Sequence, residues 1–238
     1  MRLWLLNFHI HTCMAKSKIL DNPDAILARK NIFDALEDLF DDTGIPRGSE
    51  QAMSWFRSLA RQLFDETDAT PEETFLRDPT RLIQKTGYKR RGNFFLFNYM
   101  PKSASKLKYF DTMPLVLLLD FTKDGFYGLN LHYLPNNLRE RFYLLIRQRM
   151  VGSVDDDFAR ININYDTLKS QRQFRLYRPC IRRYKTRYIG SRILRITPKD
   201  WDFAIHLPLE RFKKANRQVV YTDSRRKLAR EIEGSAEQ

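Results

Sequence analysis

The sequence predicts an α+β protein: an N-terminal helical region followed by a small SH3-like β-barrel or a bent antiparallel sheet with helical insertions. Near the N-terminus, apolar residues recur at three- and four-residue intervals, as on one face of a helix. From Gly87 onward, short aromatic-rich runs alternate with turn residues, which is typical of strands. A hydrophobic content of 42% in 238 residues is enough for a folded core.

Residues 14–86 form the expected helical region. The apolar spacing predicts helices over residues 22–42 and 49–64, and a third, short helix beginning at Thr70. Pro23 suits the first turn of the first helix, and Gly44 and Pro46 end it. Pro79 then begins a linker.

Residues 1–13 precede this region and differ from it in character. His9 and His11 interrupt a short apolar patch, and no small-residue cleavage site follows, which argues against a secretory signal. Met14 opens a polar segment typical of a cytosolic start. The hypothesis is that translation begins there, and that residues 1–13 are a non-native or disordered extension. An intact mass that includes these residues would contradict it.

Residues 87–222 form the expected basic core domain. Strands are predicted at residues 93–100, 115–120, 127–133 and 191–197. Asp124-Gly125 indicates a tight hairpin between the second and third strands. Helices are expected over residues 136–150 and 165–170, with a helical turn at Pro198, and residues 223–238 form a charged C-terminal helix or tail.

Charge is unevenly distributed along the chain. Residues 1–80 hold 9 basic and 14 acidic residues, a net charge of −5, whereas residues 81–238 hold 33 basic and 15 acidic residues, a net charge of +18. The chain as a whole carries +13. This asymmetry favours a polyanionic partner for the body and a basic protein neighbour for the front.

Several classes of function find no support in the sequence. The cysteines, Cys13 and Cys180, are too few for a disulfide framework or a thiolate zinc site. No apolar run approaches the ~18–20 residues of a membrane span. Phosphate-binding loops, nucleophile elbows and zinc-protease motifs are also lacking. We therefore expect no catalysis, cofactor, metal, small-molecule substrate or membrane partner, although missing motifs weaken an enzymatic interpretation without excluding it.

Residues 169–195 contain ten basic residues, no acidic residue, and several interleaved aromatic residues. Arginine offers planar, multi-donor contacts to phosphate, and aromatic rings can support a guanidinium group or stack on a base. The residues expected to contact nucleic acid are Arg172, Arg175, Arg178, Arg182, Arg183, Lys185 and Arg187, supported by Tyr184 and Tyr188. A solvated basic face and a surface that docks on an acidic protein remain alternatives.

A smaller basic group, Lys89, Arg90 and Arg91, precedes the first strand. It either extends the same nucleic-acid surface or forms a soluble linker.

An enzymatic alternative uses acidic residues near the strands. A metal-dependent nuclease needs clustered carboxylates, and Asp111, Asp120 and His132 are the candidates. A histidine in such a place is more often a structural hydrogen-bonding group than a general base.

Two distinctive segments, residues 109–116 (YFDTMPLV) and 124–135 (DGFYGLNLHYLP), are followed by Arg178-Pro179 and by residues 196–201 (ITPKDW) and 207–212 (LPLERF). Together they resemble the DNA end-protecting, head-completion proteins of T4-like tailed phages, over roughly residues 90–222. The resemblance implies a virion protein, present in the host cytoplasm during assembly, that binds the ends of packaged double-stranded DNA and shields them from host exonuclease. It also implies head or neck proteins as partners, and provides no catalytic residues.

The main alternative is a structural adaptor of the phage neck, tail or baseplate. Its basic face would dock on acidic protein neighbours and would not contact DNA.

Overall fold

The computed structural model describes residues 75–76, 90–153, 159–207 and 209–233. The chain divides into two compact units, Met1–Pro71 and Glu72–Gln238, and every described residue belongs to the second. Residues 1–13 and the helices expected over residues 22–42 and 49–64 lie outside the described residues.

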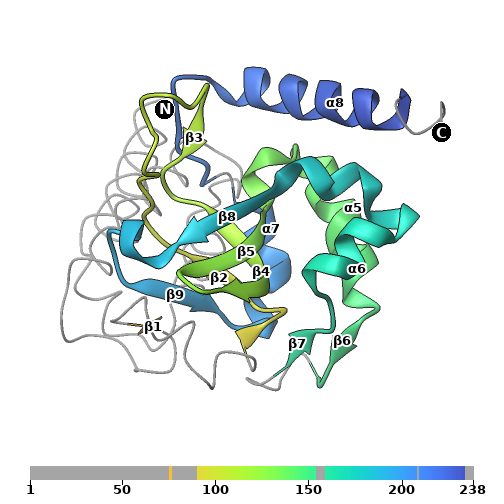
Figure 1. Cartoon of the computed structure of the whole chain (residues 1–238). Helices are drawn as coiled ribbons and strands as arrows, with labels where there is room; N and C mark the ends of the chain where they lie inside the picture. Colours follow the sequence, from red (N-terminus) through yellow and green to blue (C-terminus); the bar gives the residue numbers. More distant parts are fainter. Residues whose placement is uncertain (1–74, 77–89, 154–158, 208, 234–238) are drawn as a thin grey trace, which may run out of the picture. The chain divides into compact units, whose positions relative to one another are not determined.

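A six-stranded antiparallel sheet forms the centre of the second unit (Figure 1). In spatial order its strands are β1 (Phe75–Leu76), β9 (Ile193–Ile196), β2 (Phe94–Leu96), β4 (Leu115–Thr122), β5 (Gly125–Asn130) and β8 (Ile181–Lys185). β1 and β8 are its two edges, so the described sheet is open. The α+β class and the antiparallel sheet are confirmed, the closed-barrel alternative is wrong, and an SH3-like arrangement stays a prediction.

Two short strand pairs complete the β structure of the described residues. β3 (Phe110–Asp111) pairs with β10 (Phe212–Lys213), and β6 (Met150–Val151) pairs with β7 (Arg160–Ile161). The first pair joins the segment that enters β4 to the segment that leads into the C-terminal helix.

The predicted hairpin at Asp124-Gly125 joins β4 to β5. On its other side β5 pairs with β8, and Gly125 lies opposite Lys185 in this pairing. A Cβ atom at Gly125 would come within 1.9 Å of the Tyr184 carbonyl oxygen. Glycine is therefore required here because the two backbones approach closely.

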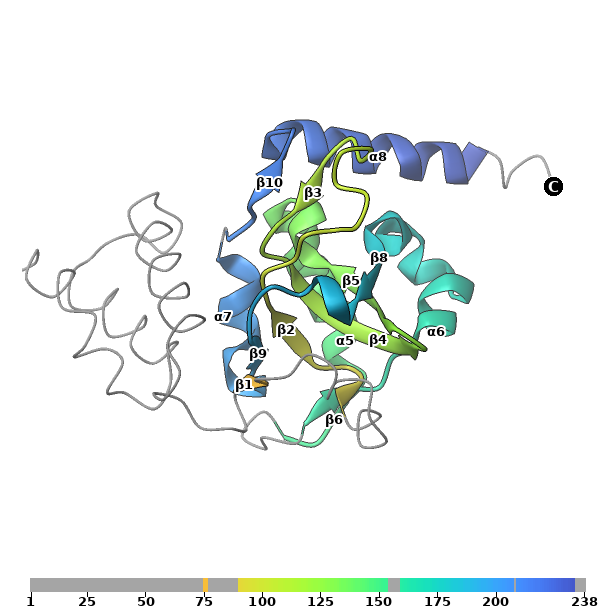
Figure 2. The ribbon, with the colours of Figure 1, turned by 60° about the vertical axis from the view of Figure 1, so that its left-hand side comes forward.

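Three described helical elements form where they were predicted: α5 (Asn136–Arg147), α6 (Tyr165–Ser170) and η6 (Pro198–Asp200). α7 (Trp201–His206) was not predicted, and the C-terminal helix is α8 (Arg217–Glu233). α8 begins earlier than the helix or tail predicted from residue 223. Figures 1 and 2 both show α8 lying across one end of the domain, where it contacts η4 (Arg172–Cys180).

Three local details differ from or add to what the sequence predicted. The strand expected over residues 127–133 ends at Asn130, whose side-chain oxygen accepts a hydrogen bond from the His132 backbone N–H at 2.9 Å and so begins a 3-10 turn, η3 (Leu131–Tyr133). The short helix expected from Thr70 does not extend through Phe75–Leu76, which form β1 and pair with β9. β8 lies in a segment for which no strand was predicted.

Apolar side chains cover both faces of the central sheet. On one face, the ring of Phe94 lies 5.4 Å from that of Trp201 in α7. On the other, Phe97, Phe126 and Tyr184 belong to a buried, aromatic-rich cluster. The edge strand β8 is thus anchored by burial on the side opposite its exposed cations.

Candidate nucleic-acid interface

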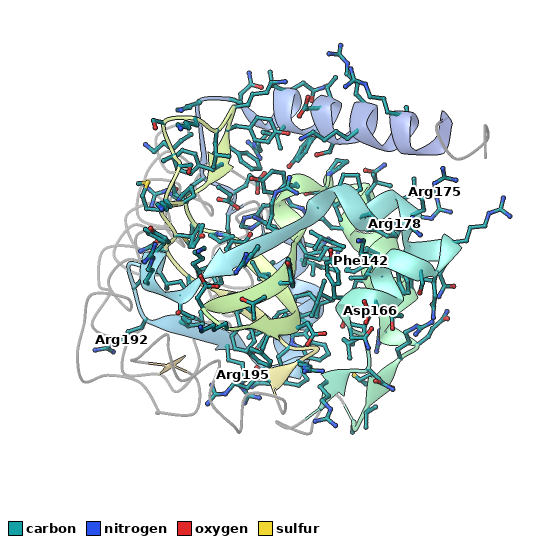
Figure 3. The ribbon with its side chains drawn as sticks, viewed as in Figure 1. Phe142, Asp166, Arg175, Arg178, Arg192 and Arg195 are labelled. Carbon is teal, nitrogen blue, oxygen red and sulfur yellow. The ribbon has the colours of Figure 1, made fainter. Side chains whose placement is uncertain are left out.

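The basic run of residues 169–195 is distributed over several elements and does not form one continuous face. It passes through the end of α6, η4, β8, η5 (Thr186–Tyr188) and β9. Figure 3 shows Arg175 and Arg178 on one side of the domain, and Arg192 and Arg195 on the opposite side of the view. The predicted contact residues therefore belong to several surfaces, which are described in turn.

The arginines of η4 form one row. A 3-10 helix has three residues per turn, so side chains spaced by three lie above one another. Arg172, Arg175 and Arg178 share one such row. Phe174, Tyr177 and Cys180 share another, and all three are buried. The three-residue spacing thus separates a cationic row from an apolar one.

The three arginines of this row differ in their freedom. Arg172 is exposed, while Arg175 and Arg178 are half-buried. Arg178 donates from Nε to the Leu168 carbonyl at 3.3 Å and from Nη2 to the Gln171 carbonyl at 3.5 Å. It therefore satisfies carbonyl groups at the end of α6, where a cation is electrostatically favoured.

On β8, side chains alternate between two faces. Arg183 Nη2 and Lys185 Nζ lie 2.7 Å from the two carboxylate oxygens of Asp124 in the hairpin turn. Hydrogen bonds from Lys185 and then Arg183 lower the pKa of Asp124 to about 2. One carboxylate faces two cations, so this exposed group keeps a net positive charge.

Arg182 and Tyr184 point to the other face of β8. The Arg182 guanidinium lies 4.3 Å above the ring centroid of Tyr133, and its Nη1 donates to the Pro179 and Ile181 carbonyls at 2.5 and 2.9 Å. Tyr184 is 4% exposed, and its ring stacks on that of Phe126. Burial prevents Tyr184 from serving as a stacking platform at the surface, so it supports the strand instead.

Arg187 and Tyr188 on η5 form a surface pair. Arg187 Cζ lies 4.8 Å from the Tyr188 ring centroid, and Arg187 Nη2 donates to the Tyr188 hydroxyl at 2.8 Å. An exposed guanidinium supported by an aromatic ring is well suited to contact a phosphate.

The smaller basic group is only partly described. Lys89 lies outside the described residues, and Arg90 is half-buried. Arg91 forms an ion pair with Asp120 at 2.9 Å and lies over the ring of Phe121. Asp120 thus compensates the charge of Arg91.

α8 carries cationic residues that were not among the predicted contact residues. Arg225, Arg226, Lys227 and Arg230 are exposed on this helix. Because α8 packs against η4, it brings a second group of cations to the end of the domain that holds the η4 row. The concentration of basic residues at positions 225–230 was the signal available in the sequence.

The nuclease candidates do not meet at one point. Asp111 and His132 are fully buried, with Asp111 Oδ2 2.7 Å from His132 Nδ1. Asp120 is engaged elsewhere, with Arg91. Burial alone would raise the pKa of Asp111, but His132 and backbone N–H groups lower it overall. The geometry therefore fits the structural interpretation of His132. In the described part of the chain, no three metal-ligating side chains are grouped to hold an ion.

None of the described helices is long and apolar enough to cross a membrane.

The described residues form a basic α+β domain with an open antiparallel sheet, a class of protein suited to contact with a polyanion. Residues 73–226 match the family Phage T4 terminal DNA protecting protein, and because this match covers more than half of the chain, the chain belongs to that family. Comparisons with the curated proteins and with the solved structures gave no match. The resemblance inferred from the sequence is confirmed, and the match also includes β1.

Proposed function

We propose that this protein binds the ends of packaged double-stranded DNA, shields them from host exonuclease and helps to complete the phage head. In this proposal it is a non-enzymatic virion protein that meets head or neck proteins during assembly in the host cytoplasm. Membership of the DNA-protecting family supports the protective role.

The observation that carries the proposed binding mode is the cationic row of η4 beside α8. Arg172 is exposed in that row, and Arg225, Arg226 and Arg230 are exposed on the adjacent helix. The surface cations Arg183 and Arg187 extend the basic character to β8 and η5. Such side chains contact phosphates and position DNA without reading its sequence.

Phosphate contacts predict a strong dependence on salt. Each neutralised phosphate releases counterions, so the logarithm of the binding constant falls with the logarithm of salt concentration by about 0.9 per contact on duplex DNA. A protein that protects any packaged genome end needs affinity that tolerates every sequence, which this mode supplies.

The test combines binding and protection. Linear and circular duplexes are titrated with the protein over a range of salt concentrations, and the linear duplex is then exposed to an exonuclease. The triple variant Arg172→Glu, Arg183→Glu and Arg187→Glu should lose binding at moderate salt and leave the ends unprotected. The variant removes three exposed cations. The slope of the logarithm of the binding constant against the logarithm of salt concentration should therefore become shallower by about 1 per lost contact.

A matched control separates position from net charge. Lys106→Glu, Arg147→Glu and Lys213→Glu change the net charge equally at exposed positions on other elements. This control should protect DNA nearly as well as the wild type. Equal losses in both triple variants would contradict the proposed surface.

The same experiment addresses the alternatives. A neck, tail or baseplate adaptor that docks on acidic proteins would bind neither duplex. A nuclease would consume the substrate in the presence of a divalent metal.

A further inference from the structure

A pocket of about 390 Å³ lies beneath α8, where β8 and the segment before β3 meet. Its volume falls in the range of about 300–1,000 Å³ typical of pockets for small ligands. Tyrosine rings and cationic side chains line it together, including Tyr109, Tyr133, Lys108, Arg182 and Lys227. The proposed surface contacts do not use this combination.

The cations and rings of the pocket form a connected row. Lys108 Nζ and Lys227 Nζ lie 6.0 and 5.7 Å from the Tyr109 ring centroid. The Tyr109 and Tyr133 centroids are 5.9 Å apart, and Arg182 covers Tyr133 at 4.3 Å. Positive charge therefore brackets both tyrosines.

Two carboxylates lie near this row, Asp223 and the pocket-lining Asp111, and they are fewer than its three cations, Lys108, Arg182 and Lys227. Asp223 forms ion pairs with Lys108 at 3.0 Å and with Lys227 at 3.2 Å, and it also accepts a hydrogen bond from the Tyr109 hydroxyl at 2.6 Å. Arg182 forms no ion pair with any carboxylate of the described residues; its Nη1 donates to the backbone carbonyls of Pro179 and Ile181. The pocket therefore carries an excess of positive charge, which favours the binding of an additional anion.

We propose that this pocket binds the terminal phosphate-bearing nucleotide of a DNA strand. A terminal phosphate monoester carries a charge of about −1.5 to −2 and three strong acceptor oxygens at neutral pH. An internal phosphodiester carries a single negative charge and is bonded to a nucleotide on each side. A pocket of this size with several cations therefore distinguishes an end by its chemistry, with no need to read sequence.

The aromatic lining suits the nucleotide that bears this phosphate. A terminal nucleotide has a stacking neighbour on one side only, so displacing it costs less than displacing an interior one. Tyr109 and Tyr133 line the pocket and place apolar ring atoms next to its cations. This inference rests on the proposed function and adds to it the chemical group that marks an end.

The test uses the full chain and three linear duplexes of one sequence, with 5′-phosphate, 3′-phosphate or only hydroxyl ends, together with a circular duplex. The wild type should prefer one of the phosphorylated duplexes over the hydroxyl-ended one by about tenfold, as expected for a charge-assisted contact. The preferred duplex identifies which strand end enters the pocket.

The variant Lys108→Gln with Lys227→Gln should lose this preference and bind the phosphorylated and hydroxyl-ended duplexes equally. The readout is the ratio of the two affinities, because the loss of a general phosphate contact lowers both alike. Both lysines are exposed, so the fold should tolerate the change. Lys102→Gln with Lys106→Gln, exposed on the neighbouring turns, is the matched control and should keep the preference.

The outcomes are distinguishable. Duplex binding without any preference for terminal phosphate, or a preference that the Lys108 and Lys227 substitutions leave intact, would overturn the pocket proposal and leave the proposed function standing. Failure to bind any duplex would overturn the proposed function itself.

Discussion

Asp111 and His132 are joined by a buried hydrogen bond in which Asp111 Oδ2 lies 2.7 Å from His132 Nδ1. Because the pKa of Asp111 is lowered, its carboxylate is ionised and can only accept a hydrogen bond. His132 Nδ1 therefore carries the proton and donates it to Asp111 Oδ2. The other carboxylate oxygen, Oδ1, accepts from the backbone N–H groups of Met113 and Arg211 at 3.0 and 3.1 Å. One side chain thus links β3, η3 and the segment before β10.

Asp111→Asn should destabilise the fold. The substitution removes the acceptor for His132 and leaves a buried polar group unsatisfied, which costs about 1–3 kcal/mol in the free energy of unfolding. Urea unfolding measures the loss. Asp120→Asn is the control: that residue forms a partly exposed pair with Arg91, and such pairs contribute about 0–1 kcal/mol. Equal losses in the two variants would contradict the structural role of Asp111.

Stability should fall in acid because of Glu210. Burial raises its pKa, but nearby groups, of which the Arg139 guanidinium has the largest effect, together outweigh burial and bring the pKa to about 2. In the unfolded chain this carboxylate has a pKa of about 4.3, so the unfolded chain binds a proton before the folded protein does as the pH falls. The contribution of Glu210 is therefore complete above about pH 5 and declines as the pH falls toward 2.

Glu210→Gln provides the measurement for this prediction. The difference in the free energy of unfolding between wild type and variant should be largest at neutral pH and should narrow between pH 5 and about 3, as the linkage relation requires. A difference that stays constant over this range would argue that Glu210 does not titrate with a lowered pKa.

Gly125→Ala should detach the basic edge strand. The new Cβ would lie 1.9 Å from the Tyr184 carbonyl oxygen, so β5 and β8 would have to separate. Overpacking of this kind costs about 1–3 kcal/mol or more. Thermal unfolding should show the loss, and DNA binding through Arg183 should weaken with it. Gly190→Ala has no atom within 4 Å of its Cβ and should be neutral in both assays.

Cys180 should resist thiol reagents in the folded protein. It is fully buried, and burial raises the pKa of its thiol to about 12. Relative to an ordinary value of 9.0, the thiolate fraction at pH 8 falls on the order of 10³-fold. In a Cys13→Ser variant, labelling should proceed only as fast as the protein unfolds. Rapid labelling without denaturant would contradict the burial of Cys180.

The periodic elements were predictable from local pattern. The helices α5 and α6, the hairpin at Asp124-Gly125 and strand β4 carry strong signals of amphipathic spacing or turn chemistry, and each forms where the pattern indicated. β8 could not be identified in this way. Its arginines and lysine conceal the alternation that a strand requires, and only pairing with β5 stabilises it.

For the predicted contact residues, too, some features could be inferred from the sequence and others depend on the fold. Composition identified the basic region, and the three-residue spacing of Arg172, Arg175 and Arg178 was present in the sequence, but its meaning depends on the 3-10 conformation of η4. The inward position of Arg182 and the burial of Tyr184 depend on which face of β8 meets the aromatic cluster.

The sequence by itself determined the charge asymmetry, the main helices and hairpin, and the resemblance to phage DNA-protecting proteins, because these depend on residue identity and short-range spacing. Only the tertiary structure decided that α8 lies against η4, that Lys108, Arg182 and Lys227 line one pocket, and that Asp111 and His132 form a buried pair. Such contacts join residues far apart along the chain, and the packing of the whole domain selects them.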